Sequence, residues 1–174
     1  AKLPQYTGTL GQAVPHDLVG DVIKIVGTEG PVHVDLVYER IGDAWSVSRL
    51  TAKVKELINT ALGIAVHDKR IEQRGEHGEF LWPIGLASPI VRAPKEGDKA
   101  RTIEHIAPEE IAEAAFLVAQ EARSLSEADL ISQAAKLLGY ARVTKKIDAA
   151  VTAAIETLKT NGRIKEEEGS VRVA

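Results

Sequence analysis

Apolar residues recur at helical spacing along most of the chain, and two segments share one pattern. In the segment 48–62 the apolar positions are Leu50, Val54, Ile58 and Leu62. In the segment 141–155, displaced by 93 residues, they are Val143, Ile147, Val151 and Ile155. A spacing of three to four residues places such side chains on one face of a helix. The pattern therefore predicts two equivalent amphipathic helices and an internal repeat.

Three polar positions and one alanine repeat in the same register. Arg49, Thr51, Lys53 and Ala61 return as Arg142, Thr144, Lys146 and Ala154. The register extends upstream, where Pro15 corresponds to Pro108, and downstream, where Arg70 corresponds to Arg163. The repeated segment thus covers far more than one helix.

In the first copy, a helix is predicted from Pro15 to the glycines at positions 27 and 30, because proline favours the first helical turn. The segment 32–34 is β-branched and predicts a short strand, and a second helix follows from about Leu36 to Trp45. The third helix is predicted from a cap at Ser46 or Ser48 to Leu62, where Gly63 favours termination. A hairpin is expected next, with strands at 64–73 and 79–82 around a turn at 75–78.

The second copy predicts the same order. Its helices are expected at 108–121, from Ser126 to Gly139, and from about Arg142 to Lys159. Ser124 and Leu125 take the place of the short strand, and a hairpin is predicted from strands at 163–167 and 170–173.

Three helices followed by a hairpin are typical of a winged helix. We therefore predict an α+β, mostly helical chain of two tandem winged-helix units related by the repeat. Residues 1–14 form an irregular lead-in, 15–83 unit one, 84–107 a proline-containing linker that includes the charged run 95–99, and 108–174 unit two. The alternative is one α+β domain whose similar halves share a core.

Several of these segments resemble a bacterial domain of unknown function, found near the C-terminus of large superfamily-one helicase-related proteins. The resemblance is carried by residues 29–37, 40–41, 44–45, 80–83, 106–112 and 137–140. Many such proteins also have a segment similar to very-short-patch-repair nucleases. The resemblance implies an accessory module of a DNA-processing protein, with the helicase and nuclease segments of the parent protein as partners.

Composition narrows the choice of function. The 174 residues are 44% hydrophobic and 27% charged, with no cysteine and a formal net charge of −3. We expect a cytoplasmic protein, because the sequence contains neither a signal peptide nor an apolar run of the roughly 20 residues that cross a bilayer. A strongly basic domain, which phosphate-driven binding favours, is not indicated by the overall charge.

The motifs that usually mark an active site are not present in the sequence. No phosphate-binding loop of the Gly-Lys-Ser/Thr type and no His-Glu-x-x-His motif occurs,. His67 and His77 are candidates for a metal site with Glu79 on the hairpin, but a solvated hairpin is the simpler interpretation. We therefore expect no enzymatic activity, no cofactor, no metal, no small-molecule substrate and no membrane partner.

Nucleic-acid binding is the leading functional prediction, because the third helix of a helix-turn-helix unit enters the major groove. The candidate contact residues are Arg49, Lys53, Lys55, Asn59, Lys69, Arg70, Arg74, Arg142, Lys145 and Lys146. Glu166, Glu167 and Glu168 on the second hairpin would repel a phosphate backbone, so binding is expected from the first hairpin together with the start of the second unit's third helix. The alternative is a protein-docking adaptor, in which Phe80, Trp82 and the segment 84–86 contact a partner protein.

Overall fold

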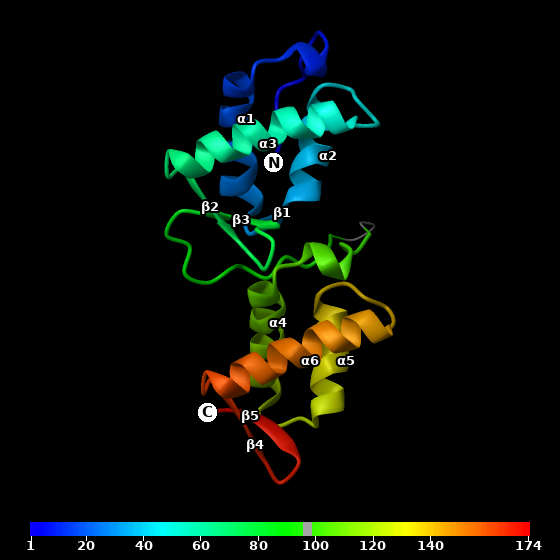
Figure 1. The fold of residues 1–174 in the computed structure, drawn as a ribbon. Helices are drawn as coiled ribbons and strands as arrows, with labels where there is room; N and C mark the ends of the chain where they lie inside the picture. The colour runs from blue at the N-terminus through cyan, green and yellow to red at the C-terminus, as the bar shows by residue number, and fades with distance from the viewer. Residues whose placement is uncertain (96–98) are drawn as a thin grey trace. The chain divides into compact units, whose positions relative to one another are not determined.

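The computed structural model describes residues 1–95 and 99–174, and the chain divides into two compact units, Ala1–Ala87 and Ser88–Ala174. Both units are α+β, with three α-helices each and small antiparallel sheets within the described residues (Figure 1). Residues 96–98, part of the charged run in the predicted linker, lie outside the described residues. None of the described helices is both long and apolar enough to pass through a bilayer.

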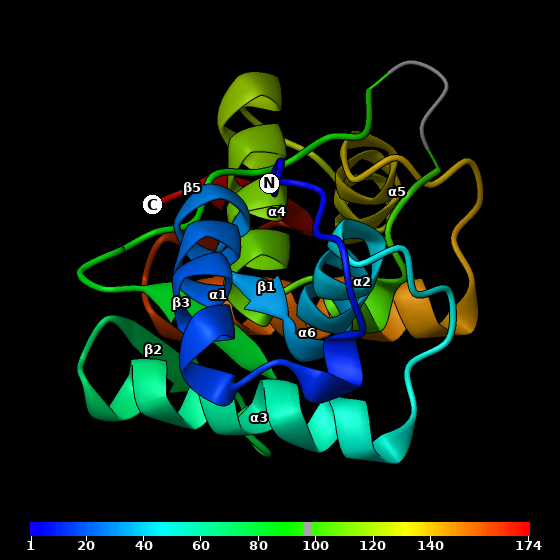
Figure 2. The ribbon, with the colours of Figure 1, turned by 90° about the horizontal axis from the view of Figure 1, so that it is seen from above.

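The first unit begins with a 3-10 turn, Leu10–Gln12, and continues through α1 (Pro15–Glu29), β1 (Val32–His33), α2 (Val34–Ala44) and α3 (Ala52–His67). The strands β2 (Ile71–Arg74) and β3 (Phe80–Pro83) complete it. The sheet order is β1-β3-β2, with all neighbours antiparallel. Figure 2 shows α3 along one side of this unit, with α1 and α2 both on its inner side.

The prediction for the third helix was wrong at its two ends. Thr51, rather than Ser46 or Ser48, caps α3: its hydroxyl accepts the backbone N–H of Val54 at 3.3 Å. The helix also continues past Gly63 to His67, because Ala65 extends the buried stripe. Gly63 is exposed, a Cβ added there would meet nothing within 4 Å, and one glycine costs a helix only about 1 kcal/mol,. The following strand is therefore Ile71–Arg74 rather than 64–73.

The core of this unit is almost wholly aliphatic. α1 and α3 supply most of it, and Leu81 of β3 closes it. The lead-in segment is part of the packing, because Leu10 is buried and Tyr6 stacks on Trp45 with ring centroids 4.8 Å apart. The backbone N–H of Tyr6 also donates to the carbonyl of Ala44 at 2.8 Å.

The second unit contains a 3-10 turn, Ile103–His105, followed by α4 (Pro108–Ala122), α5 (Glu127–Leu137) and α6 (Lys145–Thr160). The strands β4 (Ile164–Glu167) and β5 (Ser170–Val173) form its hairpin. Leu125 makes an isolated antiparallel bridge to Val171, so the predicted replacement for a first strand pairs with the hairpin. Helix α6 starts after Thr144, whose hydroxyl accepts the N–H of Ile147 at 3.4 Å, rather than at Arg142.

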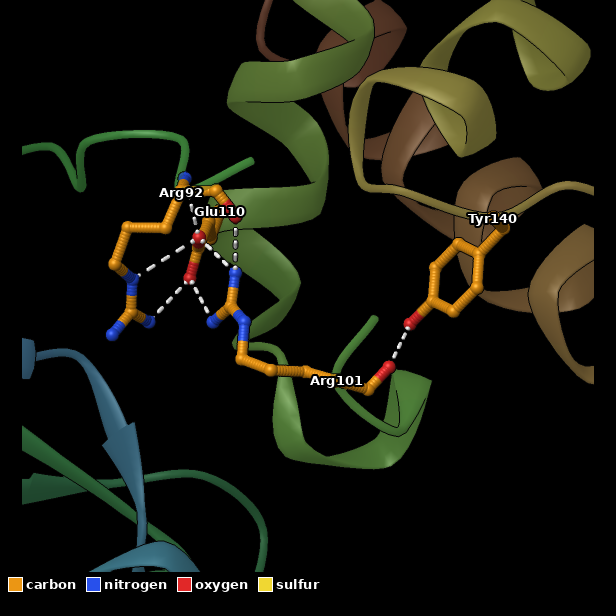
Figure 3. A network of polar contacts seen from close by, with 4 residues as sticks. All are labelled: Arg92, Arg101, Glu110 and Tyr140. Atoms are coloured by element: carbon orange, nitrogen blue, oxygen red, sulfur yellow. Dashed lines mark hydrogen bonds and ion pairs between the residues drawn. The ribbon is translucent and has the colours of Figure 1, made fainter. Parts of the chain in front are cut away.

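A buried cluster of charges ties the segment before α4 to that helix (Figure 3). Glu110 of α4 is fully buried and binds two guanidinium groups: Arg101 at 2.6 and 3.0 Å, and Arg92 at 2.6 Å. The hydroxyl of Tyr140 donates to the carbonyl of Arg101 at 2.6 Å. Of the predicted linker 84–107, the described residues from Ser88 onward therefore belong to the second unit.

Burial alone would raise the pKa of Glu110. Hydrogen bonds and charge from Arg101 and Arg92 outweigh burial and hold that pKa below its ordinary value. The carboxylate is thus ionised and serves as a structural anion, a role different from the helix-capping one that its sequence position suggests.

Candidate nucleic-acid interface

Three predicted contact residues lie at the start of α3. Arg49 precedes the helix, and Lys53 and Lys55 stand on its first turn; all three are exposed. Within the described ranges, no ion pair involves any of the three. The first turn of α3 contains no acidic residue, so this end of the unit carries a concentrated positive charge.

Tyr38 of α2 organises the next turn of α3. Its hydroxyl donates to Oδ1 of Asn59 at 2.6 Å, and the Nζ of Lys55 lies 5.0 Å from its ring centroid. Burial raises the pKa of Tyr38, so the phenol keeps its proton and remains a donor. Asn59 is one of the predicted contact residues, and an asparagine reads an adenine edge with both its carboxamide oxygen and its nitrogen. The carboxamide oxygen of Asn59 already accepts the hydrogen bond from Tyr38.

A second group of cations lies where α3 ends. The backbone N–H of Lys69 bonds to the carbonyl of Val66 and that of Arg70 to the carbonyl of Ala65, at 3.0 and 2.9 Å. This pair of bonds closes the helix in a Schellman motif, which requires a left-handed residue just after the cap. Lys69 occupies that position with φ of 53°. Lys69 and Arg70 are exposed, and no ion pair in the described part of the chain includes either one.

The same closure in the second unit uses a different residue. There Gly162 has φ of 67°, and the N–H groups of Gly162 and Arg163 bond back to Lys159 and Leu158. Glycine adopts this conformation without strain, whereas a side chain at a left-handed position costs roughly 1 kcal/mol. The first unit therefore holds a lysine at a position where the second unit has glycine.

Arg74, predicted as a phosphate contact on the hairpin, is engaged within its own sheet. Its guanidinium binds Glu72 at 2.6 and 3.1 Å and lies 4.1 Å from the ring centroid of Trp82. Trp82 and Phe80 are buried, so the side chains that the docking alternative relied on are not exposed, although Ile84 is 51% exposed. These contacts remove Arg74 from the set of free cations.

The predicted residues of the second unit are only partly available. Arg142 and Lys145 are exposed, and among the residues described neither forms an ion pair, but Lys146 pairs with Glu104 at 2.5 Å. Arg163 pairs with Glu113 and lies over Phe116, with its Cζ 3.9 Å from the ring centroid. The equivalent residue of the first unit, Arg70, is exposed.

The hairpin of the second unit is acidic. Lys159 of α6 binds three carboxylates, at 2.7 Å from Glu127, 3.0 Å from Glu156 and 2.9 Å from Glu166. Its hydrogen bonds to these groups raise the pKa of Lys159. A lysine shared by three glutamates leaves a negative surface, which disfavours a phosphate backbone.

The histidines of the first hairpin have local contacts. The ring of His67 lies 3.1 Å from the carboxylate of Asp68, and the carboxylate of Glu79 accepts the backbone N–H of His77 at 2.9 Å. These short-range contacts account for the candidate metal-binding residues His67, His77 and Glu79 without a shared ion.

A groove of about 860 Å³ opens between α4 and α5. Leu117, which is 40% exposed, lies in its wall together with Val118 and Leu137, and Glu121 and Asp129 belong to its polar lining. The groove combines apolar side chains with charged groups of both signs, because Lys136 also lines it.

The sequence did not indicate Tyr38 or the two arginines that bind Glu110. Tyr38 bonds to Asn59 on another helix, and the two arginines bind Glu110 from the segment before α4. In the sequence, a single tyrosine on a helical stripe resembles any core aromatic. The position of Glu110 directly before the apolar residues Ile111 and Ala112 was the only available signal, and all three are buried.

Comparison with known proteins adds one match. The family model described as Protein of unknown function (DUF3320) matches residues 6–56, from the segment that packs on Trp45 through the first turns of α3. No curated protein and no solved structure matches the chain. Residues 6–56 are thus similar to a domain of unknown function, in agreement with that part of the resemblance noted from the sequence.

Proposed function

We propose that the chain is a non-catalytic accessory module that binds DNA through its first unit. The observation that carries the proposal is Lys69. A lysine in a left-handed conformation, where glycine would be free of strain, supports a role for a cation at the end of α3,. Arg70 beside it, and Arg49 and Lys53 at the other end of the helix, complete the positive surface.

The proposal includes two tandem winged-helix units. It is supported by the order of elements, since each unit has three α-helices followed by a hairpin, with β1 of the first unit replaced in the second by the bridge from Leu125 to Val171. It is also supported by the caps: Thr51 and Thr144, at matching positions of the repeat, each cap the third helix. In such units the third helix and the hairpin provide the DNA contacts.

The cellular setting that we propose is a helicase- or nuclease-containing parent protein in the bacterial cytoplasm. Support comes from the resemblance of residues 29–37, 80–83 and 106–112 to the domain found in helicase-related proteins. The module would then hold DNA while catalysis takes place elsewhere in the parent.

The test is fluorescence anisotropy of a labelled 20-base-pair duplex titrated with the full chain. We expect binding at 50 mM salt that weakens steeply at 200 mM, and loss of binding in the Lys69→Glu/Arg70→Glu variant with an unchanged melting temperature. Retention of full affinity by that variant, or no binding by the native chain, would contradict the proposal.

The second candidate is a protein-docking adaptor, favoured by the α4–α5 groove around Leu117. In that case the chain would bind the purified helicase or nuclease segment of its parent, and Leu117→Asp would abolish the complex. DNA affinity would then be negligible at both salt concentrations.

A further inference from the structure

We infer that α3 of the first unit spans the major groove of B-form DNA and contacts the two phosphate strands that border it, without reading the bases. This inference rests on the proposed DNA binding and defines the class of nucleic acid and the mode of contact. It departs from the helix-turn-helix mode, in which the third helix reads base edges.

The first step is the placement of the free cations. Arg49 and Lys53 lie at the N-terminal end of α3, and Lys69 and Arg70 lie just beyond its C-terminal end. A helix of 16 residues is about 24 Å long at 1.5 Å per residue,. The major groove of B-DNA is about 12 Å wide. The two groups of cations are therefore far enough apart to reach the strands on opposite sides of the groove.

The second step is the surface between them. The exposed residues in the middle of α3 include Glu56, Asn59, Thr60 and Gly63. None of these four is a cation, and the carboxylate of Glu56 would face the acceptor-rich base edges and phosphates if the helix were inserted deeply. Gly63 presents bare backbone, with no side chain to reach a base. The middle of the helix is therefore suited to crossing the groove rather than to reading it.

The third step is the engagement of the two best candidates for base contacts. The Oδ1 of Asn59 accepts a hydrogen bond from the hydroxyl of Tyr38, and Arg74 is held by Glu72 and stacked on Trp82. Bidentate contacts to adenine or guanine need an uncommitted carboxamide or guanidinium. Binding without these contacts depends on phosphate spacing and not on sequence.

Negative groups near the two ends limit the contact to a few phosphates. Glu56 lies one turn from Lys53, and Asp68 lies between α3 and Lys69, with its carboxylate beside His67. Lys55 is set apart from these cations because its Nζ lies over the ring of Tyr38. The four remaining cations, Arg49, Lys53, Lys69 and Arg70, would give a slope of log K against log salt of about −3.6, since each phosphate contact contributes about −0.9.

The experiment measures this slope with three probes: 20-base-pair DNA duplexes rich in A·T, the same length rich in G·C, and a 20-base-pair RNA duplex. We expect the two DNA duplexes to bind within about twofold of each other. We expect the RNA duplex to bind at least tenfold more weakly, because its major groove is deep and narrow.

Variants at the two ends of α3 test the spanning geometry. Arg49→Gln/Lys53→Gln and Lys69→Gln/Arg70→Gln should each reduce the magnitude of the slope by about 1.8, which is two contacts of about 0.9. Lys24→Gln/Lys136→Gln, which removes one exposed lysine of α1 and one of α5, should leave it unchanged. Asn59→Ala should keep its affinity within twofold, with its melting temperature measured as a control for the lost bond to Tyr38.

The outcomes separate the inference from the proposed function. Absence of DNA binding overturns both. DNA binding with a tenfold sequence preference, a tenfold loss in Asn59→Ala, equal RNA binding, or a slope change at only one end overturns the spanning mode and leaves DNA binding intact.

Discussion

The hydroxyl of Tyr6 donates a hydrogen bond of 2.9 Å to Oδ1 of Asp21, which joins the N-terminal segment to α1. Asp21 is 8% exposed, and its Oδ2 has no hydrogen-bond partner within the described residues. Burial raises the pKa of this carboxyl, and the bond from Tyr6 and the charge of Lys24 only partly offset it. Ionised Asp21 is therefore a local source of instability.

The destabilisation caused by ionised Asp21 should appear in the pH dependence of the free energy of unfolding. A carboxyl whose pKa is raised by folding contributes stability that is present below its ordinary pKa of 3.8 and lost as pH rises through the folded value,. Asp21→Asn, which keeps an acceptor for Tyr6 and cannot ionise, should gain stability over the native chain as pH rises from 3 to 7. Urea denaturation at each pH measures the difference, and a constant difference across that range would refute the explanation.

The pH dependence of stability that comes from Glu110 should have the opposite sign to that from Asp21. Its lowered pKa gives stability that is present above the ordinary value of 4.5 and lost as pH falls through the folded value,. Glu110→Gln leaves Arg92 and Arg101 without a carboxylate and should destabilise the second unit by about 3 kcal/mol at pH 7. Denaturation followed by circular dichroism measures the loss. Glu109→Gln, on the exposed neighbouring position, is the matched control and should change stability by less than about 0.5 kcal/mol,.

Replacement of Lys69 by glycine should separate folding from binding. Removing the left-handed side chain should stabilise the first unit by about 0.5 to 1 kcal/mol, and removing the cation should weaken DNA binding,. The melting temperature and the anisotropy titration are measured on the same sample. A decrease in both the melting temperature and the DNA affinity would show that Lys69 is not strained. It would contradict the argument from its left-handed conformation.

Two glycines of the first unit should respond in opposite directions to alanine. Gly63→Ala fills open space on the exposed face of α3 and should stabilise the unit by up to about 1 kcal/mol,. At Gly30 a Cβ would lie 2.5 Å from both the Cδ of Pro83 and the carbonyl oxygen of Val26, so Gly30→Ala should destabilise it. The unfolding free energies of the two variants, measured by urea denaturation, test whether the two changes have opposite signs.

Matching core positions of the third helices should have matching costs. Val54 and Ile147 are both buried and occupy equivalent positions of the sequence repeat. Val54→Ala and Ile147→Ala should each destabilise their unit by about 1 to 3 kcal/mol, because each removes buried methyl groups. A neutral effect of either substitution in urea denaturation would mean that the two helices are not equivalent.

The sequence predicted the order and type of the elements because periodicity and caps are local signals. Pro15 and Pro108 open their helices, and Thr51 and Thr144, visible in the repeat, turned out to be the caps. The error at Gly63 arose because a helix tolerates one exposed glycine when its buried stripe continues to Ala65.

The candidate interface was less predictable, because it depends on which cations are already engaged. Exposed charge can be inferred from helical spacing, as for Lys53. The pairing of Arg74 with Glu72, and that of Lys146 with Glu104 across 42 residues, is set by side-chain geometry that no pattern in the sequence records. The same holds for Asn59 and Tyr38, which come from different helices.

Lys159 is the shared partner of three carboxylates, those of Glu127, Glu156 and Glu166, and this constrains how the sequence can change. The one positive charge of Lys159 neutralises the repulsion among side chains from α5, α6 and β4, so its substitution is expected to cost more stability than substitution of any one of the three glutamates. Loss of the lysine obliges compensation at three glutamates, whereas loss of any one glutamate leaves two that still hold the amine. Descendants of this sequence should therefore tolerate drift at each acid far more readily than at the base they share.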